Sequence, residues 1–266
     1  MADAPLTQLR APAHWRRIAI ASDVHLSADA PHTARAWHGA LADCDADALI
    51  LLGDYFDVWV GDDALDADPS STETPEDAAA LRFWQDAVAQ LAQASARMAV
   101  YWLVGNRDFL SAERFALATG VQRCNDPLPL DWRGQRSLLS HGDAWCTDDA
   151  DYMAFRAQVR GAEWQAQFLG QALGTRLQQA RLMRANSQAH QQAMAAPSDV
   201  NDAAVEAARV QAQASQVIHG HTHQGQSHVM PSGHARHVTL DWCVKGASRR
   251  AEWLCLTADG VQRVAA

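Results

Sequence analysis

The chain has 266 residues, of which 48% are hydrophobic and 20% are charged, so it is long enough to fold around a core of its own. Its formal net charge of −9 argues against a nucleic-acid-binding protein, because such proteins depend on lysine and arginine contacts to phosphate. The five cysteines are dispersed without a CxxC pair, and we find no signal sequence or membrane-spanning run. We therefore expect a cytoplasmic protein with reduced thiols.

Five short apolar runs, each followed by polar residues, are typical of strands that are buried on both faces. These runs are residues 17–22, 48–52, 98–104, 137–140 and 216–218. Helical patterns lie between them, and the alternation of strands and helices predicts an α/β layered fold. In such folds functional side chains gather beyond the carboxyl ends of the strands.

The segments between and after these runs have patterns of their own. Residues 34–41 and 75–93 are typical of helices, whereas residues 66–76 are rich in Pro, Ser, Thr and Asp and predict a flexible loop. After residue 223, three alternating runs predict antiparallel strands that complete a second sheet. They are residues 226–230, 236–240 and 251–256.

A long helix-forming segment, residues 149–195, lies between the fourth and fifth predicted strands. Its apolar residues fall near helical spacing, and it holds five arginines and one glutamate between Arg156 and Arg184. One interpretation is an amphipathic helical pair packed on the core. The sharper interpretation is a lid over the functional site, with an apolar face and a basic rim. We predict a single domain, residues 1–266, with the lid inserted in it.

The polar residues at the strand ends are of the kinds that bind metal ions. The seven candidate ligands are Asp23, His25, Asp54, Asn106, His141, His221 and His223. Each short motif alone is weak, but together they predict two divalent ions ~3.5–4 Å apart, with Asp54 as a bridge. Such a pair suits in-line displacement at phosphorus, because the ions neutralise the developing charge. Mixed nitrogen and oxygen ligands favour Mn, Fe or Zn over calcium, and we prefer Mn²⁺.

The motifs D-x-H, G-D-x-x-D, G-N-x-D, H-G-D and G-H-x-H, in this order, resemble those of the calcineurin-like metallophosphoesterases. The resemblance implies a four-layer α-β-β-α sandwich with a dimetal site at its centre. It also implies a division of the ligands, with one ion held by Asp23, His25 and His223, the other by Asn106, His141 and His221, and Asp54 between the two.

Arg107 stands where most of that superfamily has a histidine that acts as an acid near the leaving group. An arginine cannot give up a proton usefully near neutral pH, but it can hold a phosphate with two parallel hydrogen bonds. Its presence therefore favours a substrate with an additional phosphate, or a leaving phosphate that needs no proton, and cleavage of a pyrophosphate fits. The implied catalytic residues are Asp54, Asn106, Arg107 and His141. Asp57 and Asp143 are expected to orient ligands, and Asp108 to brace the loop.

The stretches "GDYFDVWVGDD", "GNRDFL", "SHGDAWCTDDADYMAFR" and "RLMRANS" resemble one family of this superfamily, the UDP-2,3-diacylglucosamine diphosphatases of lipid A biosynthesis. The resemblance implies a Mn²⁺-dependent pyrophosphohydrolase that cleaves its substrate at the α-phosphate. The implied substrate contacts are Asn106, Arg107, Asp149, Arg184, Ser187, Gln191 and His221. This chain departs from the family at Met194, where a lysine is usual.

The resemblance also implies partners and a location. We expect a lipid-nucleotide substrate, a peripheral position on the cytoplasmic face of the inner membrane, no nucleic acid, and a monomer. Two alternatives stay open. One is a metallophosphoesterase that acts on soluble nucleotide pyrophosphates or phosphodiesters. The other is an inactive scaffold on the same fold, which should have lost metal ligands.

Overall fold

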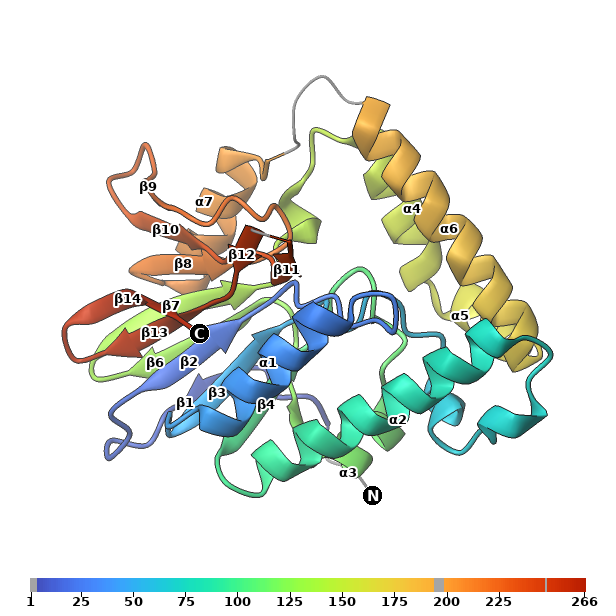
Figure 1. Cartoon of the computed structure of the whole chain (residues 1–266). Coiled ribbons are helices and arrows are strands. Elements are labelled where there is room, and N and C mark those ends of the chain that lie inside the picture. Colours follow the sequence, from blue (N-terminus) through green and yellow to red (C-terminus); the bar gives the residue numbers. More distant parts are fainter. Residues whose placement is uncertain (1–3, 194–198, 247) are drawn as a thin grey trace.

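Two six-stranded sheets lie at the centre of the computed structural model, which describes residues 4–193, 199–246 and 248–266, with the side chains of 186–193 and 248 excepted (Figure 1). The first sheet has the order β14 (Gly260–Ala265), β13 (Glu252–Thr257), β2 (Ile18–Ala21), β3 (Ala48–Leu52), β4 (Ala99–Leu103) and β5 (Gln122–Arg123). The second has the order β1 (Leu9–Arg10), β6 (Leu128–Trp132), β7 (Gln135–Ser140), β8 (Gln216–His219), β10 (Ala235–Val238) and β9 (Ser227–Val229). A small two-stranded sheet pairs β11 (Cys243–Lys245) with β12 (Ser248–Arg250).

The five apolar runs form β2, β3, β4, β7 and β8, which confirms those predicted strands. Strands β2, β3 and β4 are parallel neighbours, and Ala48 lies opposite both Ile18 and Ala99. Strands β7 and β8 are also parallel. The carboxyl ends of neighbouring strands therefore lie along one edge of each sheet, where the candidate ligands follow.

Three clusters of buried side chains define four layers. Along β2, Ile18 and Ile20 belong to the cluster between the two sheets, whereas Ala19 and Ala21 belong to the cluster under the helices of the first sheet. Helices α1 (Pro31–Asp43), α2 (Pro75–Ser95) and α3 (Glu113–Thr119) cover that sheet, and α7 (Asp202–Ala212) packs on the second. The helix–sheet–sheet–helix order confirms the predicted α-β-β-α sandwich.

Helix α2 shows how the sequence sets one of these layers. Thr74 caps its N-terminus by accepting a hydrogen bond from the Asp77 N–H, and Pro75 occupies the first turn. The buried face of the helix has residues three or four apart, among them Leu81, Trp84, Val88 and Leu91.

Of the three predicted C-terminal strands, the first two form the expected antiparallel pair in the second sheet, β9 with β10, but two other details of this prediction are wrong. Strand β10 pairs parallel with β8, and β13 joins the first sheet antiparallel to β2 instead of completing the second. An alternating pattern identifies a half-buried strand but not its neighbour. The predicted loop at 66–76 contains a 3-10 turn at Pro69–Ser71, in which Asp68 accepts from the Ser70 N–H, and helix α2 already begins at Pro75.

The described part of the predicted lid, residues 149–195, folds into three helices, α4 (Ala150–Arg160), α5 (Ala162–Leu169) and α6 (Leu173–Ala193), which rise above the sandwich beside the strand ends (Figure 1). Phe168 and Leu177 are buried in the core cluster of the first sheet, so this end of the lid packs on the body of the protein. Within the described ranges, no helix has both the length and the apolar character needed to cross a membrane.

The arginines of the lid do not form the expected basic rim. Each of the five forms an ion pair with an aspartate outside the lid: Arg156 and Arg160 with Asp143, Arg176 with Asp63, Arg181 with Asp77, and Arg184 with Asp57. The positive charges of these arginines are neutralised by the aspartates, and the ion pairs connect the lid to the rest of the protein.

Candidate metal centre

The candidate ligands come from loops that follow five strands. Asp23 and His25 follow β2, Asp54 follows β3, and Asn106 follows β4, all in the first sheet, while His141, His221 and His223 follow β7 and β8 of the second. Backbone hydrogen bonds tie these loops together in pairs. The Asp23 N–H donates to the Gly53 carbonyl at 3.1 Å, and the Gly220 N–H donates to the His141 carbonyl at 3.0 Å.

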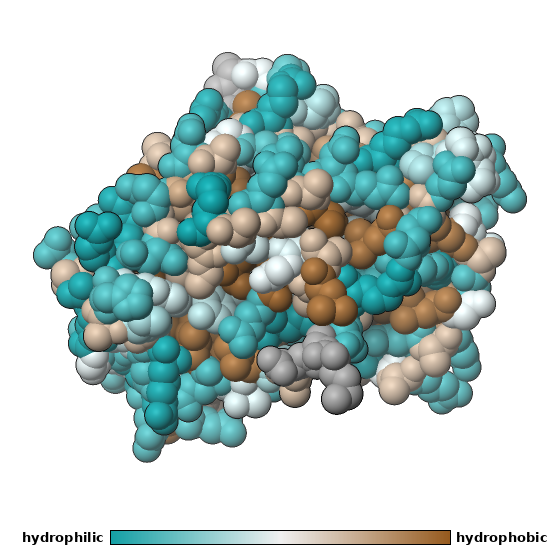
Figure 2. Space-filling view, turned by 90° about the horizontal axis from the view of Figure 1, so that it is seen from below, coloured by the Kyte–Doolittle hydropathy of each residue, from teal (hydrophilic) through white to brown (hydrophobic). Residues whose placement is uncertain are grey.

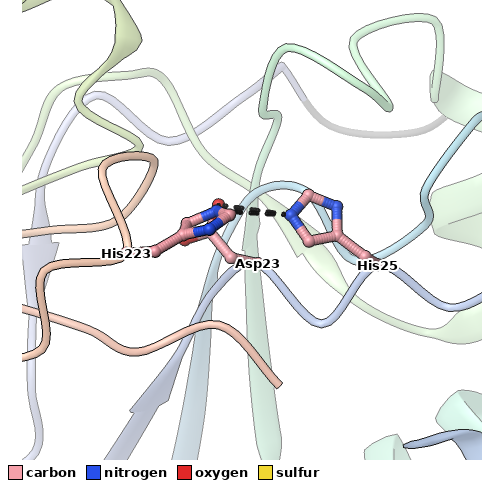
Figure 3. Close-up of side chains that lie close together, drawn as sticks. All are labelled: Asp23, His25 and His223. Carbon is pink, nitrogen blue, oxygen red and sulfur yellow. Dashed lines mark hydrogen bonds and ion pairs between the residues drawn. The ribbon is translucent and has the colours of Figure 1, made fainter. Parts of the chain in front are cut away.

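One group of candidate ligands consists of Asp23, His25 and His223 (Figure 3). His223 Nε2 lies 3.2 Å from Asp23 Oδ1 and 3.4 Å from His25 Nε2. His25 Nε2 lies 3.9 Å from the same aspartate oxygen. Two nitrogens and a carboxylate oxygen that converge in this way can bind one divalent ion.

The second group is centred on the side-chain amide of Asn106. Its Oδ1 lies 2.8 Å from His141 Nε2 and 2.9 Å from His221 Nδ1. Asp54 lies between the two groups, with Oδ1 3.6 Å from His141 Nε2 and Oδ2 4.0 Å from His25 Nδ1. All seven predicted ligands are thus brought together, and Asp54 is the one whose two oxygens face both groups.

Unsatisfied groups and backbone strain both fit bound cations here. Asp23 is fully buried, and its Oδ1 has no hydrogen-bond partner within the described part of the chain. Seven described residues other than glycine have positive φ, and five of them are candidate ligands: Asp23, His25, Asp54, His221 and His223. Strained backbone of this kind gathers where a functional geometry must be held, and ions would compensate the buried charge.

Glycines in the motifs allow close approach of the backbone to the ligands. A Cβ on Gly105 would overlap Asp54 Oδ1, and a Cβ on Gly220 would fall 2.6 Å from Asp23 Oδ2. Only glycine fits before Asn106 and before His221, because any side chain at these two positions would collide with a candidate ligand.

The charges in the metal-free centre are strongly coupled. Burial, together with the neighbouring Asp108 and Asp23, raises the pKa of Asp54 to about 7 against the opposing effect of His141. Burial alone would lower the pKa of His141, but the carboxylates of Asp54 and Asp23 outweigh it and raise it to about 9. Burial would raise the pKa of Asp23, but His223 and the other histidines hold it far below its usual range.

Three further aspartates were expected to support the site, and their hydrogen bonds and ion pairs show what each one holds. Asp108 braces the loop as expected, because it accepts from the Gly105 N–H at 2.7 Å and the Tyr55 N–H at 2.8 Å. Asp57 and Asp143 were expected to orient ligands, whereas the side-chain bonds that the structure gives them go to the lid. Asp57 pairs with Arg184 at 2.7 Å. Asp143 accepts from Tyr152 Oη at 2.9 Å and Arg156 Nε at 2.7 Å, so both aspartates hold the lid.

The ligand His141 is oriented by groups that the sequence did not reveal. Its Nδ1–H donates to the Leu52 carbonyl at 2.8 Å, which directs Nε2 toward Asn106. Its backbone N–H donates to Asp126 at 3.3 Å. A backbone carbonyl carries no signature in the sequence, so only Asp126 could have been suspected, as a carboxylate two residues before a strand.

The side chains of Arg107, Asp149 and Arg184, three further predicted substrate contacts, are described by the structure. Arg107 is half-buried, and its backbone N–H donates a hydrogen bond to Asp54 Oδ1 at 2.8 Å. Asp149 caps helix α4 by accepting from the Tyr152 N–H. Arg184 binds Asp57, as described above. Ser187 and Gln191 lie in α6 but outside the described side chains, and Met194 lies outside the described residues.

Comparison with known proteins gives a consistent assignment. A family model described as calcineurin-like phosphoesterase matches residues 16–225. A protein of Bordetella parapertussis named UDP-2,3-diacylglucosamine hydrolase is 42% identical over 251 residues, which cover 91% of this chain and 92% of the relative. One of the same name from Xanthomonas oryzae pv. oryzae is 41% identical over 227 residues, which cover 81% and 84%.

Among solved structures, a dimetal phosphatase from Danio rerio aligns with a TM-score of 0.46 and 12% identity, covering 96% of this chain and 99% of that one. Such a score carries no weight here, and the assignment depends on the family model and the relatives. The chain belongs to the calcineurin-like phosphoesterases and, within them, to the family of the UDP-2,3-diacylglucosamine hydrolases.

Proposed function

We propose that this protein hydrolyses the pyrophosphate of UDP-2,3-diacylglucosamine by attack of water at the α-phosphate. The products would be UMP and 2,3-diacylglucosamine 1-phosphate (lipid X), in lipid A biosynthesis. The names of the relatives support this substrate. The observation that carries the proposal is Arg107 beside the metal centre. Its backbone is fixed on Asp54, and among the described residues its guanidinium forms no ion pair, so it is available for a phosphate.

The centre would hold two divalent ions, for which we propose Mn²⁺. The first would bind to Asp23, His25 and His223 and the second to Asn106, His141 and His221, with Asp54 between them. When bound, such ions polarise a phosphoryl oxygen and neutralise charge that develops on it. Their mixed nitrogen and oxygen ligands support manganese over calcium but do not distinguish it from iron or zinc.

The residues around the centre would bind and orient the substrate. Asn106 and Arg107 would contact its phosphates, and the rest of the substrate would contact Asp149, Arg184, Ser187, Gln191 and His221. The departing group is a phosphate monoester, which is stable as an anion and takes no proton from the enzyme. An arginine that holds this phosphate therefore serves better than a histidine that would protonate it.

The lid would carry the contacts to the acyl chains and to a membrane surface. Phe155, Leu169 and Leu182 are large apolar side chains exposed on its helices, by 44%, 41% and 60%. On the underside of the molecule, hydrophobic residues form small patches separated by hydrophilic ones (Figure 2). We propose that the protein is a monomer, bound peripherally through the lid to the cytoplasmic face of the inner membrane, with no nucleic-acid partner.

A soluble nucleotide pyrophosphate or phosphodiester is the second candidate substrate. The exposed apolar residues of the lid have no use with such a substrate, and they favour the lipid nucleotide. A scaffold without activity is disfavoured by the complete set of seven ligands, because the buried carboxylates of Asp23 and Asp54 would be costly without ions to compensate their charge.

The proposal is tested by measuring hydrolysis of UDP-2,3-diacylglucosamine, with and without Mn²⁺, by the wild type and two variants. Asp54→Ala should abolish turnover and metal binding, because it removes the carboxylate that faces both groups of ligands. Arg107→Ala should raise KM and lower kcat/KM by ~10²-fold, the loss expected for a charged hydrogen-bonded contact, with both ions still bound. Turnover of dinucleoside polyphosphates in preference to the lipid nucleotide would refute the proposal.

A further inference from the structure

The lid holds the loop of Asn106 and Arg107 at two points. Arg160, at the end of α4, donates from its guanidinium to the Gly105 carbonyl at 2.9 Å. The same guanidinium lies 5.0 Å from the centre of the Phe109 ring, and Trp164 of α5 lies 6.2 Å from that ring. On the side of the core, the buried Asp108 carboxylate accepts a hydrogen bond from the Gly105 N–H. The Gly105 residue is therefore held on its N–H by the core and on its carbonyl by the lid.

Helix α4 contacts the ligand motifs of only one of the two groups. Arg160 binds the carbonyl next to Asn106, Arg156 binds Asp143 two residues after His141, and the Tyr152 ring lies 5.7 Å from that of His221. Among the described residues, α4 makes no hydrogen bond, ion pair or ring contact with Asp23, His25 or His223. The two ion sites thus differ in their dependence on the lid.

We propose that Arg160 is a positioning residue for the ion held by Asn106, His141 and His221, and that the lid supports this site while leaving the site of Asp23, His25 and His223 unaffected. The inference rests on the two-ion centre of the proposed function. Among the described residues, Arg160 contacts Gly105, Asp143 and Phe109 and none of the seven candidate ligands. It acts by fixing the peptide between Gly105 and Asn106, whose amide oxygen must stay within reach of two histidines.

The physical reason lies in what would replace this contact. Without Arg160 the Gly105 carbonyl has only water as a partner, and the Phe109 ring loses the cation that packs on it. The loop keeps its bonds to Asp108 but can tilt about them, which moves the Asn106 oxygen relative to His141 and His221. Loss of a partner that orients a ligand typically weakens metal binding by ~10–100-fold.

The lid offers a matched control. Arg181 of α6 also forms an ion pair with the core, to Asp77 of α2 at 2.5 Å, but that pair has no contact with a ligand motif. Arg181→Ala therefore removes an ion pair between lid and core, as Arg160→Ala also does by breaking the pair with Asp143, but it does not release the Gly105 carbonyl. Arg160→Lys keeps a positive donor in reach of the carbonyl and should restore part of the effect.

The experiment is a calorimetric titration of the metal-free proteins with Mn²⁺ and, separately, with Zn²⁺. The wild type and Arg181→Ala should bind two ions alike. Arg160→Ala should bind one ion as the wild type does and the other ~10–100-fold more weakly, with an intermediate value for Arg160→Lys. At high Mn²⁺ its kcat should recover toward that of the wild type, which a general loss of structure would not allow. Thermal unfolding with a chelator present should be similar for Arg160→Ala and Arg181→Ala.

Unchanged binding of both ions by Arg160→Ala would overturn the inference, and so would equal weakening of both sites. A wild type that binds fewer than two ions would also overturn it. A wild type that binds two ions but leaves UDP-2,3-diacylglucosamine intact would refute the proposed function instead, and the titrations of Arg160→Ala would still decide the inference.

Discussion

Backbone strain at the ligands has a cost that bound ions offset. Asp23, Asp54 and His223 are among five ligands with positive φ, a conformation that costs about 1–3 kcal/mol at each non-glycine residue. The surrounding bonds hold them there, as between the Asp23 N–H and the Gly53 carbonyl. The site is therefore shaped in advance, and ions need not reorganise it.

Gly105 should not tolerate even a methyl group. Gly105→Ala places a Cβ against the carboxylate and backbone of Asp54, so we expect a loss of about 1–3 kcal/mol in the free energy of unfolding, and loss of metal binding. Gly39→Ala is the matched control, because this glycine lies within α1 with no atom near the added Cβ. It should stabilise the protein by about 0.5–1 kcal/mol. Denaturant unfolding and Mn²⁺ titration measure both. Normal metal binding by Gly105→Ala would contradict the steric argument.

Metal binding should release protons and strengthen as the pH rises. In the metal-free centre the pKa of Asp54 is raised to about 7 by burial, and that of His141 to about 9 by carboxylates that outweigh burial. Both groups must lose their protons to bind a cation, so affinity for Mn²⁺ should increase from pH 6 to pH 9 and level off above it. Titration at pH 7 in two buffers of different ionisation enthalpy measures the protons released. Binding that releases none would exclude these groups as ligands.

Much of the site could be predicted at this scale, and the reason is geometric. Asp23, Asn106 and His141 each follow an apolar run, and the ends of parallel strands meet along one edge, so their chemistry can be combined before a structure exists. The Leu52 carbonyl that orients His141 and the Gly105 carbonyl that binds Arg160 could not be predicted, because every residue has a carbonyl.

At the scale of elements, the lid depends on one buried arginine. Arg176 of α6 is 2% exposed and donates to the Val60 carbonyl and to Asp63. Arg176→Ala should cost about 2 kcal/mol, because the carbonyl is left without its charged donor, and it should make the lid more sensitive to protease. Arg114→Ala breaks an exposed pair with Asp66 and should cost no more than about 0.5 kcal/mol. Equal effects of the two substitutions in unfolding and limited proteolysis would contradict this anchoring role.

The sequence predicts the positions of the strands more reliably than which strands pair with each other in a sheet. The runs that became β2, β3 and β4 are continuous and apolar, and the structure places them side by side as parallel strands. The sequence predicts the second sheet for the run that forms β13, which instead joins the first, because alternation shows that one face of a strand is buried but not which sheet buries it. The lid's arginines were misjudged for a similar reason, since composition counts charges but does not show their partners.

For the whole molecule, membrane association should depend on the apolar face of the lid. Leu182→Ser removes a 60% exposed side chain of α6 and should weaken binding to vesicles with anionic lipid by ~10-fold, the value of one buried leucine. Leu117→Ser is the control, since Leu117 is 66% exposed but lies on α3, away from the lid. Sedimentation with vesicles measures both. Equal weakening by the two substitutions would show that the lid does not dock on the membrane.

The position of β13 has a consequence for synthesis on the ribosome. This strand pairs with β2 in the first sheet, although the two come from opposite ends of the chain. During synthesis, the edge of β2 that later pairs with β13 has no partner strand. Asp23, which follows β2, likewise has no contact with His223 until that residue has been made. The nascent protein therefore exposes an unpaired strand until its translation is nearly finished, which is the period in which a chaperone would protect it from aggregation.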